Sequence, residues 1–305
     1  MNKIEDLQEQ VKRLKATSRF DYLLGPQTTY GTGGPADVAL FPADAGELAE
    51  AVLLLRELGV SWCTLGGGSN VLVADQGVRG AVILTTAMTQ HSVRGRELSV
   101  GAGLTSHAVA EAARDHALSG AEFLAWLPGS VGGACFMNAR AYGGEISKVL
   151  RRAEVVTSEG EVRSLKLIPR DFSYKTSPFQ GSGDVICRAT FLLRPGDRGE
   201  IGARMDEIGL SRESKHEQDH PSCGCVFKND RTIGVPSGRL IEQAGLKGYR
   251  VGDARVSPHH ANFVFNMGQA SSAQLRQVME HVKATVFEHT GHTLGFEVQF
   301  MGQWE

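Results

Sequence analysis

The first stretch of the chain carries apolar residues three or four positions apart, which is the spacing of one face of a helix. These residues are Ile4, Leu7, Val11 and Leu14. They predict an amphipathic helix over 4–15 that docks on the rest of the protein. A second helical pattern covers 46–58 and ends beside Gly59, a residue type that often terminates helices.

Between residues 60 and 193 the apolar residues form short β-rich runs separated by polar or glycine turns. The expected strands cover 60–65, 71–73, 81–84, 92–93, 98–100, 155–157, 162–167 and 185–193. Helical patterns at 105–116 and 144–150 interrupt them. The first of these strands leads into glycines and then another strand, whereas a dinucleotide-binding turn leads into a helix. We therefore expect an α+β arrangement with an antiparallel component.

The last third of the chain has a different pattern. A cluster of proline, glycine and charge at 195–199 predicts a linker. Beyond it, helical patterns and short β-rich runs alternate. The expected helices cover 199–215, 236–244 and 271–290, and the expected strands lie near 226–227, 263–266 and 297–301. This part is predicted to be a separate α/β domain.

Composition narrows the class of protein. Of the 305 residues, 41% are hydrophobic and 22% are charged, as in an ordinary folded protein. A net charge of -2 gives no basic field for nucleic acid or a membrane surface, and no apolar run is long enough for a membrane span. The charged start lacks a signal-peptide pattern, and five cysteines suit a reducing compartment. We expect a cytoplasmic protein with no obligate protein partner.

Two glycine-rich stretches are candidates for a cofactor site. The first comprises Gly66, Gly67, Gly68, Ser69 and Asn70. The second runs from Pro128 through Gly129, Ser130, Val131, Gly132 and Gly133 to Asn138 and Gly144. Backbone N–H groups of residues without a Cβ can approach phosphates or a flat ring closely. A tight hairpin turn is the alternative explanation for the first stretch.

These stretches make the sequence resemble one enzyme family. Residues 30–37 (YGTGGPAD), 65–75 (LGGGSNVLVAD) and 128–144 match, in order and spacing, the UDP-N-acetylenolpyruvoylglucosamine reductases, also called UDP-N-acetylmuramate dehydrogenases. The resemblance covers nearly the whole chain after about residue 25. It implies a two-part FAD-binding domain of the vanillyl-alcohol oxidase type, followed by a substrate-binding domain.

The expected domains follow from this resemblance. Residues 1–26 form an N-terminal helix, and 27–195 form the FAD-binding domain, with its two subdomains divided near 86. Residues 196–305 form the substrate-binding domain, whose last strand either closes that domain or returns to the FAD domain.

The resemblance also implies a reaction in peptidoglycan precursor synthesis, and thus in cell-wall biogenesis, cell shape and division. NADPH reduces FAD, which then reduces the enolpyruvyl group of UDP-N-acetylglucosamine enolpyruvate to give UDP-N-acetylmuramate. The substrate carboxylate needs a cation as it gains enolate character, and the neighbouring carbon needs a proton. The segment 171–179 supplies Tyr174 and Lys175. The family usually has arginine after this tyrosine, and a lysine lacks the planar bidentate fork of arginine. A solvated surface lysine is the alternative.

Cys225 is the expected proton donor. It lies in the segment 220–229 (HPSCGCVFKN), where most of the family has a serine. A thiol, with an ordinary pKa of ~8.5, remains mainly protonated at neutral pH and is a stronger acid than a hydroxyl. Cys223 and Cys225 could instead form a zinc half-site or a redox pair, but no second ligand pair follows at zinc spacing.

Glu297, in Leu294–Val298, matches the family's catalytic glutamate, and a glutamate at a strand edge facing water is the alternative. Resemblance and charge also suggest a substrate-binding set. Its members are Tyr174, Lys228, Asn229, His260 and Asn262. Adjacent residues of a strand point to opposite faces, so His259 and His260 in a strand would not share a metal ion, and no metal is expected.

Two other functions remain open from the sequence. One is a flavin-dependent oxidase of the same FAD-binding architecture, although the first glycine stretch has no histidine for a covalent flavin link. The other is a nucleotide-sugar binding protein that has lost catalysis, which the replacements at Lys175 and Cys225 suggest. Glu297 and both glycine stretches favour the reductase.

Overall fold

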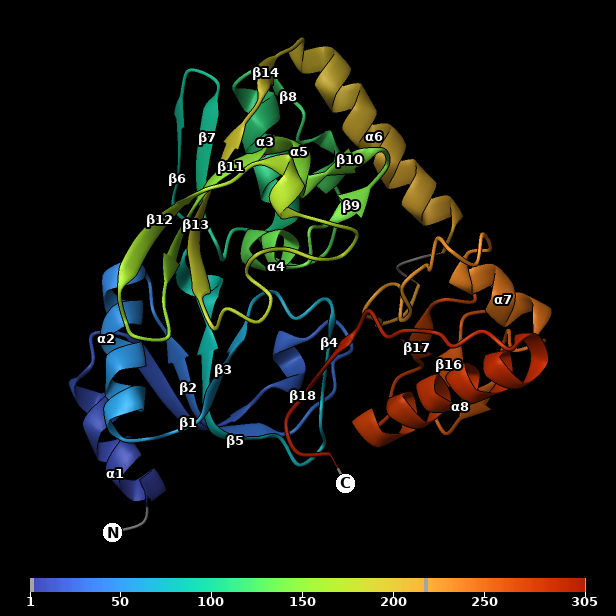
Figure 1. The fold of residues 1–305 in the computed structure, drawn as a ribbon, viewed down its shortest axis with the longest axis horizontal. Coiled ribbons are helices and arrows are strands. Elements are labelled where there is room, and N and C mark those ends of the chain that lie inside the picture. The colour runs from blue at the N-terminus through green and yellow to red at the C-terminus, as the bar shows by residue number, and fades with distance from the viewer. Residues whose placement is uncertain (1–2, 217–218, 305) are drawn as a thin grey trace. The chain divides into compact units, whose positions relative to one another are not determined.

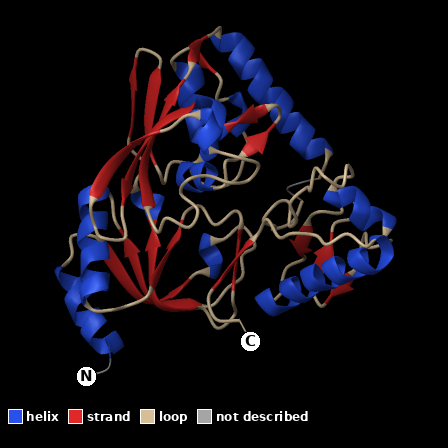
Figure 2. Cartoon of the chain, in the orientation of Figure 1, coloured by secondary structure: helices blue, strands red, loops and turns tan. Residues whose placement is uncertain are grey.

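The computed structural model describes residues 3–216 and 219–304, with side chains from Leu7 onward. Contacts divide the chain into two compact units. Unit 1 comprises the residues up to Tyr22, Ala36–Gly67 and Arg79–Leu210, and unit 2 comprises Leu23–Pro35, Gly68–Val78 and Ser211 onward. Unit 2 is therefore assembled from three separate segments of the chain. Helices and strands occur together in both units (Figure 2), as expected for the α+β class.

The first sheet of unit 1 has the strand order β1-β2-β5-β3. Its strands are β1 (Thr17–Leu23), β2 (Pro35–Phe41), β5 (Val78–Leu84) and β3 (Trp62–Leu65), and β3 runs parallel to β5. The helices α1 (Lys3–Gln10) and α2 (Ala45–Glu57), drawn in blue in Figure 1, share an apolar cluster with this sheet. Leu7, Leu48 and Ile83 are fully buried in it. The predicted docking helix is confirmed.

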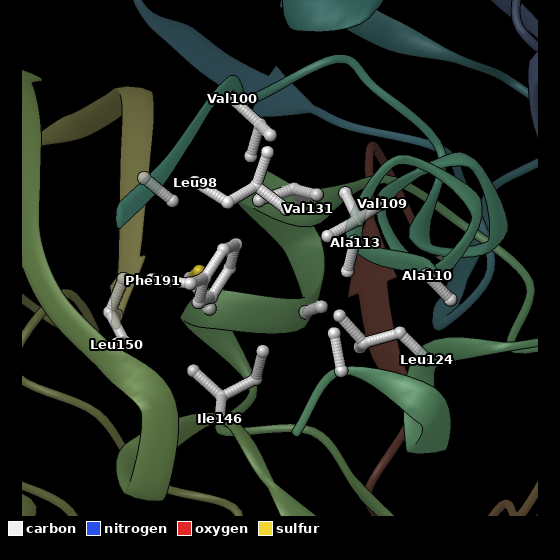
Figure 3. Close-up of a cluster of buried hydrophobic side chains, with 14 of the residues drawn as sticks. Leu98, Val100, Val109, Ala110, Ala113, Leu124, Val131, Ile146, Leu150 and Phe191 are labelled. Carbon is white, nitrogen blue, oxygen red and sulfur yellow. The ribbon is translucent and has the colours of Figure 1, made fainter. Parts of the chain in front are cut away.

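The second sheet of unit 1 is antiparallel, with the order β12-β11-β13-β7-β6. Its strands are β6 (His91–Arg94), β7 (Glu97–Gly101), β11 (Leu150–Val156), β12 (Val162–Lys166) and β13 (Val185–Leu192). The helices α3 (Ser106–Asp115) and α4 (Val131–Phe136) bury Val109 and Val131 in a cluster with Leu98, Val100 and Phe191 (Figure 3). This cluster fixes α4, the helix that begins in the second glycine stretch.

Short elements complete unit 1. They are α5 (Ile146–Val149), β8 (Leu118–Ser119), β9 (Arg140–Ala141), β10 (Gly144–Glu145), β14 (Arg194–Pro195) and α6 (Arg198–Ser214), and α6 extends past the end of the unit at Leu210. Single 3-10 turns occur at Val11–Arg13, Thr85–Ala87, Glu122–Leu124 and Pro169–Asp171, and another, Gly25–Gln27, lies in unit 2. The expected linker at 195–199 is wrong in part, because Arg194 and Pro195 pair with Ser119 and Leu118 and α6 already begins at Arg198.

Unit 2 contains a three-stranded antiparallel sheet and two helices. The sheet consists of β15 (Arg250–Val251), β16 (Ala254–Val256) and β17 (Val264–Asn266), and the helices are α7 (Ser237–Gln243) and α8 (Ser272–Thr290). α8 buries Leu275, Val278 and Val282 in the core of the unit. The expected strand at 226–227 is wrong: Cys225 and Phe227 form isolated bridges to Phe263 and Phe296.

The last strand, β18 (Gln299–Met301), pairs in parallel with β4 (Val71–Val73), and both belong to unit 2. Phe300 lies opposite Leu72 in this pair. The two units group residues by their contacts and do not test the predicted domain ranges. The ranges 27–195 and 196–305 therefore stay a prediction. Among the described residues, no helix is both long and apolar enough to cross a membrane.

Candidate active site

The two glycine stretches contact each other inside unit 1. The N–H of Gly67 donates a hydrogen bond to the Ser130 hydroxyl at 3.0 Å. A Cβ on Gly67 would lie 2.6 Å from both Gly129 Cα and Ser130 N, which is closer than non-bonded heavy atoms can approach. Only glycine at 67 allows the two stretches to pack this closely, and Ser130 is itself buried.

The remaining residues of the first stretch belong to unit 2. Gly68 adopts a left-handed conformation, φ +61°, and a Cβ there would lie 2.7 Å from Thr28 Cα. The side-chain amide of Asn70 donates to the backbone carbonyl of Glu297 at 3.0 Å. The glycine turn is therefore divided, with Gly66 and Gly67 in unit 1 and the residues from Gly68 onward in unit 2.

The second stretch leaves room at one glycine. A Cβ on Gly133 would have no closer neighbour than the Ser130 hydroxyl at 3.8 Å, an ordinary van der Waals distance. At Gly132 the space is filled, because a Cβ would lie 3.0 Å from the Ala102 Cβ. The half-buried Gly133 therefore has free space beside its Cα, which a flat or anionic group of the expected FAD site could approach. The predicted Pro128 is exposed beside this turn.

Asn138 connects the second glycine stretch to the segment that carries Lys175. Its buried side-chain amide donates to the Ser173 carbonyl and the Glu145 carboxylate, both at 2.9 Å, and accepts from the Ser147 N–H at 3.1 Å. Ser173 begins the turn Ser173–Thr176, whose ends exchange backbone hydrogen bonds at 3.2 and 3.1 Å. Asn138 thus holds this turn against the glycine stretch.

Tyr174 and Lys175 occupy the two central positions of that turn, and both are half-buried. Lys175 has φ +57°, a left-handed conformation that is uncommon for a residue with a side chain. Its carbonyl accepts a hydrogen bond from the Gln180 side chain at 3.1 Å. A strained backbone maintained by neighbouring bonds is a frequent feature of functional sites.

Cys225 and Glu297 lie together in unit 2. The Glu297 N–H donates to the carbonyl of Val226 at 2.8 Å, so the backbone of the glutamate lies beside the residue that comes after Cys225. Glu297 is 7% exposed, whereas Cys225 is half-buried. Burial, with smaller contributions from the neighbouring Cys225 and Glu297 and against the effect of the bond to Tyr30, raises the pKa of the Cys223 thiol to about 12. The structure thus brings the segments of Cys225 and Glu297 together, and their shared catalytic role stays a prediction.

Two asparagines of the expected substrate-binding set bond to the backbone. The Asn262 side chain accepts from the Phe227 N–H at 2.9 Å and donates to the Phe227 carbonyl at 2.8 Å. Asn229 accepts from the N–H of Ser237, the first residue of α7, at 2.8 Å. Lys228 is half-buried and donates its N–H to the Gly295 carbonyl at 2.8 Å. These bonds align the segments that carry Cys225 and Glu297.

The histidine pair does not lie in a strand. His259 and His260 occupy the turn between β16 and β17, where both backbone N–H groups donate to the Ser257 hydroxyl at 3.2 Å. The strand expected for them is wrong, because Ser257 starts a turn at this point. The His260 ring packs edge-on against Phe263 at 4.7 Å.

His259 instead meets residues that the sequence analysis did not select. His216, Asp219 and His259 each place a potential metal ligand within 4.8 Å of the others, and all three are exposed. The two imidazole rings are stacked at 4.2 Å, and the His216 Nδ1 is bonded to Asp219 at 2.8 Å. A metal ion lies in the plane of each imidazole that binds it. Stacked rings would therefore have to rotate before sharing an ion, and the arrangement fits a ring stack better.

Comparisons with known proteins agree with this geometry. A family model described as an FAD binding domain matches residues 36–166, and one described as the C-terminal domain of UDP-N-acetylenolpyruvoylglucosamine reductase matches 215–301. A UDP-N-acetylenolpyruvoylglucosamine reductase of Pediococcus pentosaceus is 43% identical over 92% of this chain and 93% of its own length. One of Streptococcus agalactiae serotype III is 39% identical over 98% of this chain and 99% of its own length.

A solved structure is similar over nearly the same extent. The crystal structure of UDP-N-acetylenolpyruvylglucosamine reductase from Thermus caldophilus has a TM-score of 0.78 and 32% identity. The match covers 94% of this chain and 99% of that one. Two domain types, one for FAD and one specific to these reductases, thus follow each other along the chain.

Proposed function

Because the chain belongs to the UDP-N-acetylenolpyruvoylglucosamine reductase family, it is an FAD-dependent oxidoreductase of peptidoglycan precursor synthesis, and we propose that Lys175, Cys225 and Glu297 carry out its chemistry. The substrate is a nucleotide sugar, UDP-N-acetylglucosamine enolpyruvate, and the product is UDP-N-acetylmuramate. Bound FAD supplies the hydride, which it receives from NADPH. A nucleotide-sugar substrate and an NADPH requirement favour action in the cytoplasm, without nucleic acid or an obligate protein partner.

The FAD site in this proposal consists of both glycine stretches. Its residues are Gly66, Gly67, Gly68, Ser69, Asn70, Pro128, Gly129, Ser130, Gly132, Gly133 and Asn138. The supporting observation is the contact of Gly67 with Gly129 and Ser130, together with the open space at Gly133. Asn138 contributes indirectly, since its amide is bonded to Ser173, Glu145 and Ser147.

Lys175 has the role of binding the substrate carboxylate. Negative charge accumulates on that carboxylate as the enolpyruvyl group gains enolate character, and a nearby ammonium group stabilises it. The Ser173–Thr176 turn, which Asn138 and Gln180 hold, fixes where the lysine chain begins. Lysine provides a point charge in place of a planar fork, so we expect one strong contact to the carboxylate where arginine would make two.

Cys225 has the role of general acid. Its Sγ proton goes to the carbon adjacent to the one that receives the hydride, which leaves a thiolate. A thiol ionises with an ordinary pKa of ~8.5, far more readily than a serine hydroxyl, so the substitution keeps a proton donor at this position. The supporting observation is its half-buried position beside Glu297, at the backbone bridge to Phe263.

Glu297 is proposed to act at the carboxylate end of the substrate. Glu297 is 7% exposed, so its side chain is largely shielded from bulk water. Tyr174, Lys228 and His260 complete the substrate contacts in this proposal, while Asn229 and Asn262 act through the backbone segments that they hold.

Separate half-reactions test this assignment. In the anaerobic holoenzyme, NADPH should bleach the flavin, and UDP-N-acetylglucosamine enolpyruvate should restore its colour. We expect Cys225→Ala to leave bleaching unchanged and to slow colour recovery by about 10²-fold or more, the usual contribution of a general acid. Cys225→Ser should retain most of the rate, and Cys135→Ala is a control for loss of a buried thiol. Recovery with oxygen but not with substrate would instead indicate an oxidase.

A further inference from the structure

A buried tyrosine is bonded to the turn that carries Cys225. Tyr30 is completely buried, and its hydroxyl accepts a hydrogen bond from the Cys223 thiol at 3.3 Å. Its carbonyl accepts another from the Asn266 side chain at 2.9 Å. Both atoms of this contact are buried, and both residues belong to unit 2.

The middle residue of this turn has no side chain to hold it, and its N–H makes one long bond, to the Ser222 hydroxyl at 3.4 Å. Gly224 has φ +76°, and a Cβ there would have no neighbour within 4 Å. A glycine with open space around it has many accessible conformations, so the residues on either side must restrict the turn. Cys223 does this on the amino side. Its pKa, raised by burial to about 12, keeps the thiol protonated and able to donate.

The other side of Cys225 is fixed independently. The Val226 N–H donates to the Asn262 carbonyl at 2.8 Å, and the Asn262 side chain holds Phe227. Before the turn, the carbonyl of Pro221 accepts from the Asn266 N–H at 2.9 Å. Within the turn itself, the Cys223 side chain makes the bond to Tyr30.

A role in packing alone would not require a hydroxyl. Burying a phenol oxygen without a good partner costs free energy, and phenylalanine would fill the same volume without that cost. The segment also reaches the first glycine stretch, because the N–H of Thr29 donates to the Gly68 carbonyl at 3.1 Å. Thr29 and Tyr30 thus connect the glycine turn to the Cys223–Cys225 turn.

We propose that Tyr30 is a positioning residue for the reduction, which fixes the Cys223–Cys225 turn through its bond to Cys223 and so holds the Cys225 thiol where its proton must leave. The proposal rests on the function proposed above, since it takes Cys225 as the proton donor. Tyr30 does not touch the substrate in this scheme. Its contribution is to restrict the conformations of the turn, so that the Cys225 thiol occupies its productive position more often.

The test is a double-mutant cycle on the holoenzyme. Tyr30→Phe and Cys223→Ala should each slow anaerobic flavin reoxidation by UDP-N-acetylglucosamine enolpyruvate, by roughly three- to tenfold, the value of one hydrogen bond. The double variant should be no slower than the slower single one. Cys223→Ser should restore the rate, because its hydroxyl can donate to Tyr30. The solvent deuterium isotope effect on reoxidation should rise in Tyr30→Phe, while flavin reduction by NADPH stays unchanged.

Three results would overturn the proposal: reoxidation of Tyr30→Phe at the wild-type rate, additive effects in the double variant, or equal slowing of both half-reactions. If Tyr30→Phe does not fold, the comparison of Cys223→Ala with Cys223→Ser decides, and equal rates for the two reject the bond. Cys225→Ala separates this inference from the proposed function. If Cys225→Ala reoxidises its flavin at the wild-type rate, Cys225 is not the acid. If Cys225→Ala is slow but Tyr30→Phe is as fast as the wild type, only the role of Tyr30 is rejected.

Discussion

The carboxylate of Asp75 accepts a hydrogen bond from the backbone N–H of Ser272 at 2.8 Å, and a second from Ala273 at 2.9 Å. These N–H groups belong to the first turn of α8, where helix donors have no partner within the helix. Asp75 follows β4, so this contact attaches the region of the first glycine stretch to the longest helix of unit 2.

Replacing Asp75 should therefore loosen unit 2. We expect Asp75→Ala to lower the free energy of unfolding by about 1 kcal/mol, as for the loss of a helix cap, with a lower Tm of the holoenzyme. Asp75→Asn keeps one acceptor and should lose less. Calorimetry measures both, and equal stability of the alanine variant and the wild type would contradict the capping role.

Gly67→Ala tests the contact between the glycine stretches. Its Cβ would overlap Gly129 and Ser130 backbone atoms, so the stretches must separate. We expect a loss of about 1–3 kcal/mol of stability and a lower flavin content, measured by absorbance of flavin released on denaturation. Gly133→Ala is the matched comparison. Position 133 has room for a methyl group, so this variant should keep its stability. Weakened FAD binding would then place the cofactor at Gly133, and normal FAD binding would exclude it from that position.

Iodoacetamide should react first with Cys225. Burial raises the pKa of Cys63 to about 11 and that of Cys187 and Cys223 to about 12, and it also raises the pKa of the fully buried Cys135. Few thiolates of these four exist at pH 8, and the thiolate is the reactive form. Peptide mass spectrometry should find the label at Cys225, with slow reoxidation and normal flavin reduction. Labelling that persists unchanged in Cys225→Ser would contradict this order of reactivity.

The same buried thiols should make the protein sensitive to alkali. Their pKa values in the folded state lie above the ~8.5 of an unfolded thiol, so the unfolded state alone loses protons between these values. Stability is thus complete below about pH 8.5 and falls at higher pH, by about 1.4 kcal/mol per pH unit for each thiol. Urea unfolding from pH 8 to 10.5 measures how the free energy of unfolding falls with pH. In Cys135→Ala this fall per pH unit should be smaller than in the wild type by about that amount. The cavity in this variant shifts stability equally at every pH, so an unchanged slope would reject the prediction.

Asn262→Asp should be harmful although the side chains have the same shape. A carboxylate still accepts from the Phe227 N–H but can no longer donate to the Phe227 carbonyl. We expect a loss of about 1–3 kcal/mol, the cost of an unsatisfied buried group, together with slower flavin reoxidation. Asn229→Asp is the matched control, because the bond that it accepts from Ser237 survives. Equal effects of the two changes in thermal unfolding would argue against this explanation.

The sequence was most informative where local signals decide the structure. α8 was expected at 271–290 and runs from Ser272 to Thr290, because Ser271 caps its start and Gly291 ends it with φ +70°. β1 and β2 were missed. Both segments carry a strand signal that was not used: burial alternates along Thr17–Leu23, and Pro35–Phe41 contains a short apolar run.

Motifs could nominate residues for the candidate site but not the contacts between them. Lys175, Cys225 and Glu297 were selected in this way and stay a prediction, whereas the family is confirmed. The bonds from Asn138 to Ser173 and from Cys223 to Tyr30 join residues far apart in the chain, so no local pattern reports them. The error at His259 and His260 has the same origin. A strand was assumed for them, whereas the Ser257 hydroxyl bonds both of their N–H groups and forms a turn.

The three-segment construction of unit 2 has a consequence for synthesis. Asn70 and its partner Glu297 are 227 positions apart, and β4 pairs with the last strand of the chain. On the ribosome, β4 and Tyr30 must wait for almost the entire remainder of the polypeptide, whereas the apolar clusters of unit 1 are complete by Met205. A product that stops before β18 would therefore contain the cores of unit 1 and a glycine turn without its later partners, so unit 2 is completed only after β18 has been synthesised.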